Sequence, residues 1–155
     1  SAIRVLLDFY PFSGDYKALG KMLIPAISPV KARKSIDLQI KLGFIKKDDA
    51  GYLRPTELFL TSGYDAQSVV LNNFVLRSMD LAREALDRFP REERNLSCLT
   101  IGVSKKGFEA IRNEIRAFRR KIFELVKSEK ADTVYQLGIQ FFPLSRRYHM
   151  TEDSP

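Results

Sequence analysis

The sequence contains one cysteine, one histidine and no tryptophan in 155 residues. A single cysteine cannot form a disulfide within the chain, and Cys98 with His149 supplies too few ligands for a zinc site of the Cys and His type. We therefore expect no disulfide framework, no metal site and no cofactor. Because no base lies near Cys98 in the sequence pattern, we interpret it as a small core or sheet residue and not as a nucleophile.

Long apolar runs are also missing from the chain. No run approaches the roughly 20 residues that a membrane-spanning helix needs. The opening residues, SAIRVLLDFYPF, do not have the layout of a signal peptide. The expectation is a chain without a membrane partner, located in the cytoplasm.

Recognisable catalytic arrangements are absent as well. The segment between Gly14 and Gly20 lacks the lysine pattern of a phosphate-binding loop. No Ser-His-Asp or Cys-His set can be assembled around His149, which lies in the C-terminal tail, and no cluster of carboxylates stands out. The sequence therefore predicts that the protein is not an enzyme.

Positive charge is present in excess and is concentrated in two parts of the chain. The net charge is +7; residues 13–56 hold nine Lys or Arg against four Asp, and residues 104–155 hold eleven against seven acidic residues. A basic surface favours a polyanion, since the release of counterions drives phosphate binding. A modest basic excess is also common on domains that touch no nucleic acid, so charge alone leaves both interpretations open.

Residues 15–55 have the element order of a winged helix-turn-helix: a short helix, a turn, a longer helix and a hairpin. A preceding helix is expected over Ala2–Tyr10, where apolar residues recur at spacings of three and four. Ser28 and Pro29 favour a helix start, and Gly43 favours its end. The turn Asp49-Ala50-Gly51 would join the two hairpin strands. The inward face of the longer helix is expected to consist of Ala32, Ile36 and Ile40.

Candidate DNA-contacting residues follow from this arrangement. The first turns of the longer helix would face base edges and phosphates, and the hairpin, or wing, would flank the same surface. The candidates are Ser28, Lys31, Arg33, Lys34, Lys46, Lys47 and Arg54. Ser28 is equally explained as a helix cap alone, and the cations as an ordinary solvated face. Asp37, Asp48 and Asp49 dilute the field, and Gln39 stands where such a helix usually buries a leucine.

The remaining residues predict a second, α-β-α-β module. Residues 57–65 form a connector, residues 66–145 the module and residues 146–155 a tail. The module combines two long helices, Ala66–Phe89 and Ser104–Lys130, with two strands, Leu96–Val103 and Thr133–Phe142. Because two strands are too few to stand alone, we expect the small sheet to borrow the wing region or to be completed across a homodimer. The fold class is α+β, with residues 1–56 as the winged helix-turn-helix.

Several stretches together resemble a known family. They are AISPVKARKSIDLQIKLGFIKKDDAGYL, TSG, SCLTIGVSKKGFEAIRNEIRAFRRKI and VYQLGIQFFPLS. The chain is similar over nearly its whole length to the Fibrobacter-type paralogous family of predicted bacterial transcriptional regulators, in which a winged-helix segment precedes a domain of unknown function. The resemblance implies a role in regulation. It implies no ligand and no catalytic residue.

Two functions are expected from these observations. The first is a DNA-binding transcriptional regulator that places its winged helix on double-stranded DNA, with the C-terminal module dimerising or sensing. The alternative is a protein–protein interaction module whose winged-helix fold does not bind DNA and whose wide apolar helix docks a partner.

Overall fold

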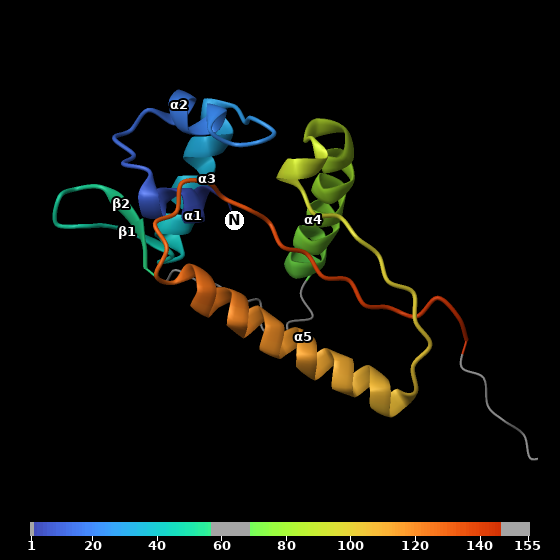
Figure 1. Ribbon diagram of the computed structural model, residues 1–155. Helices are drawn as coiled ribbons and strands as arrows, with labels where there is room; N and C mark the ends of the chain where they lie inside the picture. The colour runs from blue at the N-terminus through green and yellow to red at the C-terminus, as the bar shows by residue number, and fades with distance from the viewer. Residues whose placement is uncertain (1, 57–68, 147–155) are drawn as a thin grey trace, which may run out of the picture. The chain divides into compact units, whose positions relative to one another are not determined.

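The structure, a computed structural model, describes residues 2–56 and 69–146 (Figure 1). The predicted connector 57–65 and nearly all of the predicted tail lie outside these residues. The chain divides into two compact units; the first takes the described parts of 1–66 and 97–135, and the second those of 67–96 and 136–155. Helices and one small antiparallel sheet make up the fold, which confirms the α+β class. The elements are α1 (Ala2–Phe9), α2 (Tyr16–Lys21), α3 (Pro29–Lys41), β1 (Ile45–Lys47), β2 (Leu53–Pro55), α4 (Val69–Arg88), a 3-10 turn (Arg91–Glu93) and α5 (Lys105–Val126).

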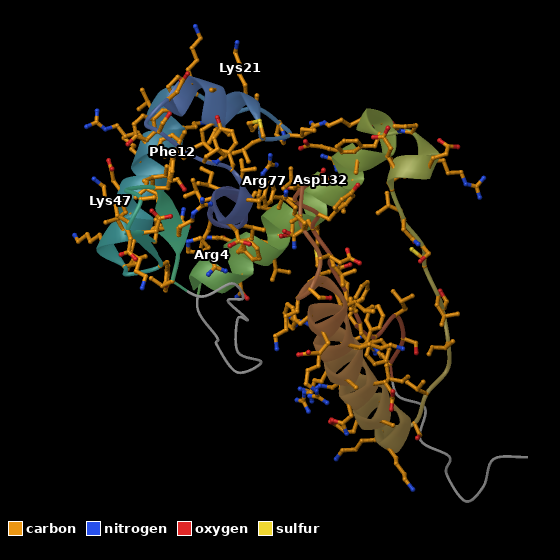
Figure 2. The ribbon with its side chains drawn as sticks, turned by 60° about the vertical axis from the view of Figure 1, so that its left-hand side comes forward. Arg4, Phe12, Lys21, Lys47, Arg77 and Asp132 are labelled. Carbon is orange, nitrogen blue, oxygen red and sulfur yellow. The ribbon has the colours of Figure 1, made fainter. Side chains whose placement is uncertain are left out.

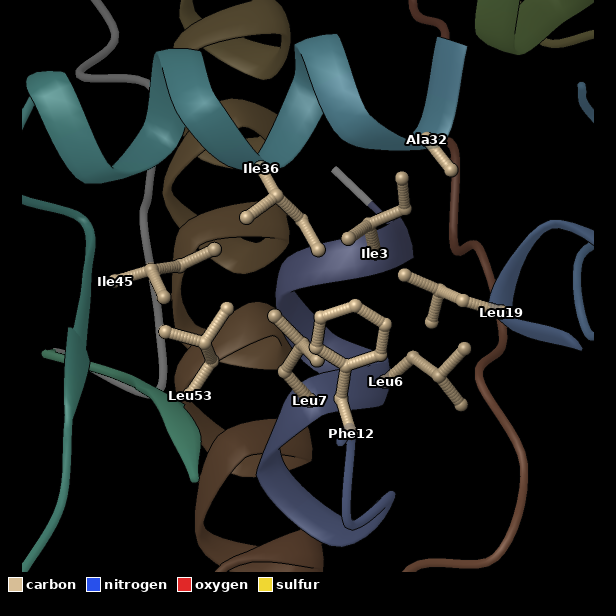
Figure 3. Close-up of a cluster of buried hydrophobic side chains, with 9 residues drawn as sticks. All are labelled: Ile3, Leu6, Leu7, Phe12, Leu19, Ala32, Ile36, Ile45 and Leu53. Atoms are coloured by element: carbon tan, nitrogen blue, oxygen red, sulfur yellow. The ribbon is translucent and has the colours of Figure 1, made fainter. Parts of the chain in front are cut away.

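One apolar core joins the first five of these elements. α2 packs against α3, α1 packs against both α3 and β2, and α3 packs against β1. Figure 3 shows the buried side chains converging from the three helices and the hairpin. Val134, which is near the last residue of the first unit in the sequence, also packs against this core. The core residues are Ile3, Leu6, Leu7, Phe12, Leu19, Ala32, Ile36, Ile45 and Leu53.

The segment that connects α2 to α3 folds back closely on the end of α2. Asp15 caps α2, and its Oδ1 accepts hydrogen bonds from the N–H groups of Lys17 (3.0 Å) and Ala18 (2.9 Å). Beyond α2, the Ile27 N–H donates to the Gly20 carbonyl over 3.0 Å. A Cβ atom at Gly20 would collide with the carbonyl oxygen of Ile27. This position therefore requires glycine for its lack of a side chain.

α3 begins and ends where its capping residues predict. Pro29 occupies its first turn. At the other end, Gly43 takes a φ of 73°, its N–H donates to the Ile40 carbonyl, and the Phe44 N–H donates to the Gln39 carbonyl, both over 2.9 Å. This pair of bonds is a Schellman motif, which satisfies carbonyls left over at a helix end and needs a left-handed residue that glycine adopts without strain.

The inward face of α3 differs from the expectation in one residue. Ala32 and Ile36 are fully buried as predicted, but Ile40 is 44% exposed and Gln39 is buried. Its Nε2 donates to the carbonyl (3.2 Å) and to the Oγ (3.1 Å) of Ser35, one turn earlier in the helix. Because these local bonds satisfy the N–H groups of the amide, Gln39 can occupy a core position at which the periodicity predicted the neighbouring isoleucine.

β1 and β2 form an antiparallel hairpin in which Ile45 pairs with Pro55 and Lys47 with Leu53. The turn is the one predicted from Asp49-Ala50-Gly51. Gly51 has a φ of 84° and its N–H donates to the Asp48 carbonyl over 2.9 Å. Ile45 and Leu53 point into the core, while Lys46 and Lys47 are exposed.

The two long helices lie close to their predicted ranges. α4 is described over Val69–Arg88, and α5 over Lys105–Val126. Ser104 caps α5, with its Oγ accepting a hydrogen bond from the Gly107 N–H over 3.1 Å. None of the residues of α5 is buried, although its apolar residues follow one side of the helix. The exposed members of that stripe include Phe118, Leu125 and Val126.

The two strands predicted for the C-terminal half were wrong. Leu96–Val103 and Thr133–Phe142 contain no helix and no strand in the structure, and the two-stranded sheet β1–β2 is the sheet found in the described ranges. An alternating pattern predicts which faces of an extended segment are apolar, but a strand also needs a partner for its backbone hydrogen bonds. In the described ranges neither segment is assigned to a strand, so the alternation alone did not determine their conformation.

Candidate nucleic-acid interface

The outer face of α3 carries three exposed lysines. Successive residues of an α-helix lie about 100° apart, so Lys34 and Lys41 lie about 160° and 140° around the helix from Ile36. Ile36 is fully buried, whereas Lys31, Lys34 and Lys41 are exposed. The helix therefore keeps its apolar side in the core and presents amines to solvent.

Arg33 lies on the flank of this face. Its Nε is 3.8 Å from Oδ2 of Asp37, and the two side chains are 70% and 61% exposed. Exposed ion pairs of this kind contribute little to stability. The guanidinium can therefore exchange the carboxylate for another anion at small cost.

Ser28 acts as the N-cap of α3. Its Oγ accepts a hydrogen bond from the Lys31 N–H over 3.3 Å, and its backbone is extended. The capping role is thus confirmed. A phosphate contact by the exposed Ser28 hydroxyl stays a prediction.

The hairpin adds two exposed amines. Lys46 and Lys47 lie on β1, the strand that packs against α3, so the cationic residues of α3 and of the wing belong to neighbouring elements. In Figure 2, Lys47 points away from the ribbon, as does Lys21 at the end of α2. Lys21 was not among the candidates. The sequence does offer a signal for it, because it is a basic residue at the end of the short helix that precedes the turn to α3.

Arg54 differs from the other candidates because its side chain is used inside the fold. Its Nη1 donates to the carbonyl oxygens of Leu7 (2.9 Å) and Asp8 (2.8 Å), and its Nε donates to Oδ2 of Asp48 (3.2 Å). Its guanidinium carbon also lies 5.8 Å from the centre of the Tyr52 ring. The last carbonyls of a helix lack partners within the helix, and a cation there is favoured by the helix dipole. Arg54 thus connects the wing to the end of α1, and a DNA contact by it stays a prediction.

Asp48 organises the turn of the wing. Its Oδ1 accepts a hydrogen bond from the Tyr52 N–H over 2.8 Å, and its Oδ2 accepts one from Arg54. Desolvation works to raise the pKa of Asp48, but these hydrogen bonds and the charge of Arg54 outweigh it and lower the pKa below its ordinary value. From the sequence, Asp48 was interpreted only as a negative charge that weakens the positive potential of the candidate DNA-binding surface. An Asp at the start of a Gly-containing turn was the signal for its structural role.

Exposed aliphatic side chains accompany the cations around α3. Val30, Leu38 and Leu42 are 63%, 55% and 54% exposed. Met22 and Ile24, in the segment between α2 and α3, are also exposed. The candidate surface is therefore mixed, with amines and aliphatic groups side by side on one helix.

Other kinds of site find no support among the residues that the structure describes. No group of three or more His, Cys, Asp or Glu residues is arranged to hold a metal ion there. Of the helices described, none combines the length and the apolar character required to cross a bilayer. Cys98 is a free, exposed cysteine, so its predicted place in a core was wrong.

Comparison with known proteins gives one result. The family described as Domain of unknown function (DUF4423) matches residues 1–144. No curated protein and no solved structure matches the chain.

Proposed function

The chain belongs to the DUF4423 family, a family defined by a domain of unknown function, and we propose that it is a DNA-binding transcriptional regulator. In this proposal residues 2–56 act as a winged helix-turn-helix. α3 enters the major groove of double-stranded DNA, and the hairpin contacts the neighbouring backbone. The resemblance to the Fibrobacter-type regulators, a cytoplasmic location and dimerisation or sensing by the C-terminal half are parts of the same proposal.

The observation that carries the proposal is the two-sidedness of α3. Its buried side holds Ala32 and Ile36, and its opposite side offers exposed Lys31, Lys34 and Lys41. A groove-reading helix needs this division, because it must be supported from behind while its front stays open to base edges and phosphates. The caps at Ser28 and Gly43 fix where the helix starts and stops, which also fixes the position of its first cationic turn.

The exposed aliphatic residues are compatible with this role. Apolar side chains contact the methyl group of thymine in the major groove, so Val30 and Leu38 suit a helix that reads bases. The lysines would supply most of the affinity through phosphates, and the aliphatic groups would contribute to sequence preference.

A binding titration against a generic DNA duplex tests the proposal. Fluorescence anisotropy should detect binding at low salt, with an affinity that falls steeply as salt rises, by a slope of about 0.9 per phosphate neutralised. The triple variant Lys31→Glu, Arg33→Glu, Lys34→Glu should lose binding. The matched control, Lys105→Glu, Lys106→Glu, Lys121→Glu, makes the same change of net charge on the exposed surface of α5 and should retain binding. Equal losses in the two triple variants, or no binding by the wild type, would overturn the proposal.

A protein–protein interaction module is the second candidate function. The exposed Val30, Leu38 and Leu42 favour it, because aliphatic groups on one helix face are suited to an apolar groove of a partner. Leu38→Ser with Leu42→Ser separates the two functions. For a regulator, this pair should leave the salt slope with DNA unchanged, whereas a docking module should show no duplex binding in any variant.

A further inference from the structure

One side of α3 carries an aliphatic group, a carboxylate and two amines in a row. We call this row the α3 ridge; it consists of Val30, Lys34, Asp37 and Lys41. At about 100° per residue, these four residues lie about 120°, 160°, 100° and 140° around the helix from Ile36, all in the same sense. Ile36 is fully buried, and all four residues of the ridge are exposed. The α3 ridge is therefore the part of the helix that faces away from the core.

Asp37 is the member of the α3 ridge that a purely phosphate-binding surface does not explain. A carboxylate repels phosphates, yet Asp37 shares its side of the helix with two lysines. Its ion pair with Arg33 is 3.8 Å long, which exceeds hydrogen-bonding distance, and its side chain is 61% exposed. The carboxylate oxygens of Asp37 are therefore accessible to another hydrogen-bond donor.

We propose that the α3 ridge reads base edges. Asp37 accepts a hydrogen bond from the N4 amino group of cytosine, Lys34 donates to O6 and N7 of guanine, and Val30 contacts the methyl group of thymine. The inference rests on the proposed function, because it assigns base partners to a helix that we propose to enter the major groove. The preferred ligand is then a duplex in which a thymine lies close to a G·C pair.

The assignment follows from the donors and acceptors of the two charged side chains. In the major groove guanine presents two acceptors, and cytosine presents an amino group that donates. An ionised carboxylate only accepts and an ammonium only donates, so Asp37 and Lys34 match the two bases of one pair. Exchanging the two bases would place the carboxylate against acceptors and the ammonium against a donor. The two side chains together therefore distinguish G·C from C·G.

Adenine is the less suitable partner for this helix. Its amino group lies beside the N7 acceptor, and the side chain that matches both atoms is an amide. The one amide side chain of α3 is Gln39, which is buried and donates to Ser35. The exposed side of α3 therefore has no amide to offer to adenine, which leaves cytosine as the partner of the carboxylate.

The positions of the ridge residues along the helix fit contacts with neighbouring base pairs. From Val30 to Asp37 the helix rises by about 10 Å, at about 1.5 Å per residue. This distance corresponds to about three base pairs at about 3.4 Å each. Lys34 and Asp37 are three residues apart, so their Cβ atoms lie about 5–6 Å from one another and both can reach one base pair. Lys41 lies one turn further along and is left for a phosphate.

Selection of duplexes from a randomised pool by the full chain tests the inference. The selected site should contain a G·C pair in one orientation, with a thymine within about three base pairs of it. Wild type should bind this site roughly 5- to 100-fold more tightly than the same site with the G·C pair reversed. Binding without sequence preference would overturn the inference and leave the proposed function standing. Absence of binding to any duplex would overturn both.

Asp37→Asn distinguishes a base contact from a charge that only pairs with Arg33. An amide matches adenine, so this variant should lose its preference for cytosine at that position and bind a duplex with adenine there more tightly. If Asp37 only weakens the positive potential, the variant should instead gain affinity for every duplex by the same factor, and the inference is overturned. Fluorescence anisotropy against four duplexes that differ in this one base pair gives the measurement.

Two variants serve as matched controls for Asp37→Asn. Asp49→Asn removes the same charge from the exposed turn of the hairpin and should leave the base preference unchanged. Arg33→Gln breaks the same ion pair from its other end. It should lower affinity for all four duplexes evenly, because it removes a positive charge. A change of base preference in either control would overturn the assignment of that preference to Asp37.

Replacement of the thymine by deoxyuridine tests the contact of Val30, because it removes the methyl group alone. Wild type should bind the deoxyuridine duplex roughly 3- to 5-fold more weakly, as expected for about one buried methyl group. Val30→Ala should bind the two duplexes equally. Since Val30 is 63% exposed, the variant should keep the fold, which circular dichroism checks. An equal loss of affinity for wild type and variant would overturn the assignment of Val30 to thymine.

Discussion

The Nη1 atom of Arg54 lies 2.9 Å from the carbonyl oxygen of Leu7, although the two residues are 47 positions apart along the chain. This bond and its neighbour at Asp8 attach the second strand of the hairpin to the end of the first helix. The hairpin is thus attached to α1 by Arg54, a residue that was predicted from the sequence to contact DNA. The arginine that stabilises the wing and the lysines that remain free for an anion occupy the same small hairpin.

Replacing Arg54 should destabilise the N-terminal unit. Arg54→Ala leaves two helix-end carbonyls and Asp48 without their donor, and we expect a loss of about 1–3 kcal/mol in the free energy of unfolding. Arg54→Lys keeps the charge but cannot reach three acceptors with a planar fork, so it should recover only part of the loss. Urea unfolding measures both. Arg33→Ala, on a mostly exposed side chain, should change stability by less than about 0.5 kcal/mol.

The wing should weaken in acid through Asp48. Because the pKa of Asp48 is lowered in the folded state, its stabilising contribution is complete above the unfolded-state pKa, near 4, and is lost as the pH falls through the lower folded-state pKa. Asp48→Asn keeps an acceptor for the Tyr52 N–H but has no charge for Arg54. The gap in stability between wild type and Asp48→Asn should therefore be largest at neutral pH and shrink on acidification. A constant gap from pH 7 to pH 2.5 would contradict this role, and Asp49→Asn in the same turn serves as the control.

Gly20→Ala should be destabilising, against the usual preference for alanine in a helix. In an unconstrained helix this change stabilises by up to about 1 kcal/mol. Here the added methyl would collide with the Ile27 carbonyl, so we expect a cost of about 1–3 kcal/mol. Thermal unfolding compared with Gly102→Ala, where nothing lies within 4 Å of the added methyl, gives the measurement. An increase in Tm for Gly20→Ala would show that the closure between α2 and α3 can relax.

Gln39 offers a test of how the core of α3 is satisfied. Among the described residues its amide donates to Ser35, one turn away, so Gln39→Leu fills the same space with an apolar group and should stabilise the fold by about 1 kcal/mol. Gln39→Ala removes volume without that gain and should destabilise it. Chemical unfolding distinguishes the two directions. Binding of DNA should be unaffected by either change, since the residue faces the core.

Local signals in the sequence were sufficient for much of the N-terminal unit. Ser28 with Pro29, Gly43 and the Asp49-Ala50-Gly51 turn each specify a backbone conformation through their own chemistry, and each occurs where it was predicted. The burial of Gln39 in place of Ile40 could not be predicted in the same way. Periodicity assigns a face to within about one residue, and only the Ser35 contact decides which of two neighbours can be buried.

The C-terminal half shows the limit of periodicity more clearly. The capping serine and apolar stripe of α5 are properties of one segment, and the helix was predicted correctly. A strand depends on a partner that can lie anywhere in the chain or in another molecule, so the alternation in Leu96–Val103 and Thr133–Phe142 did not determine pairing. Arg54 illustrates the same point at the candidate site. Its side chain bonds to the carbonyls at the end of α1 instead of pointing into solvent, and this depends on how the hairpin packs against that helix.

The glycine joint at the end of α3 has a mechanical consequence. The positive φ of Gly43 sets the direction in which the chain leaves α3. Thr56, which directly follows β2, donates from its N–H to the Phe44 carbonyl (3.0 Å) and from its Oγ1 to the Gly43 carbonyl (2.9 Å). These contacts hold the end of the hairpin against the end of α3. We therefore expect a shift of the hairpin to be passed on to the lysine-bearing helix.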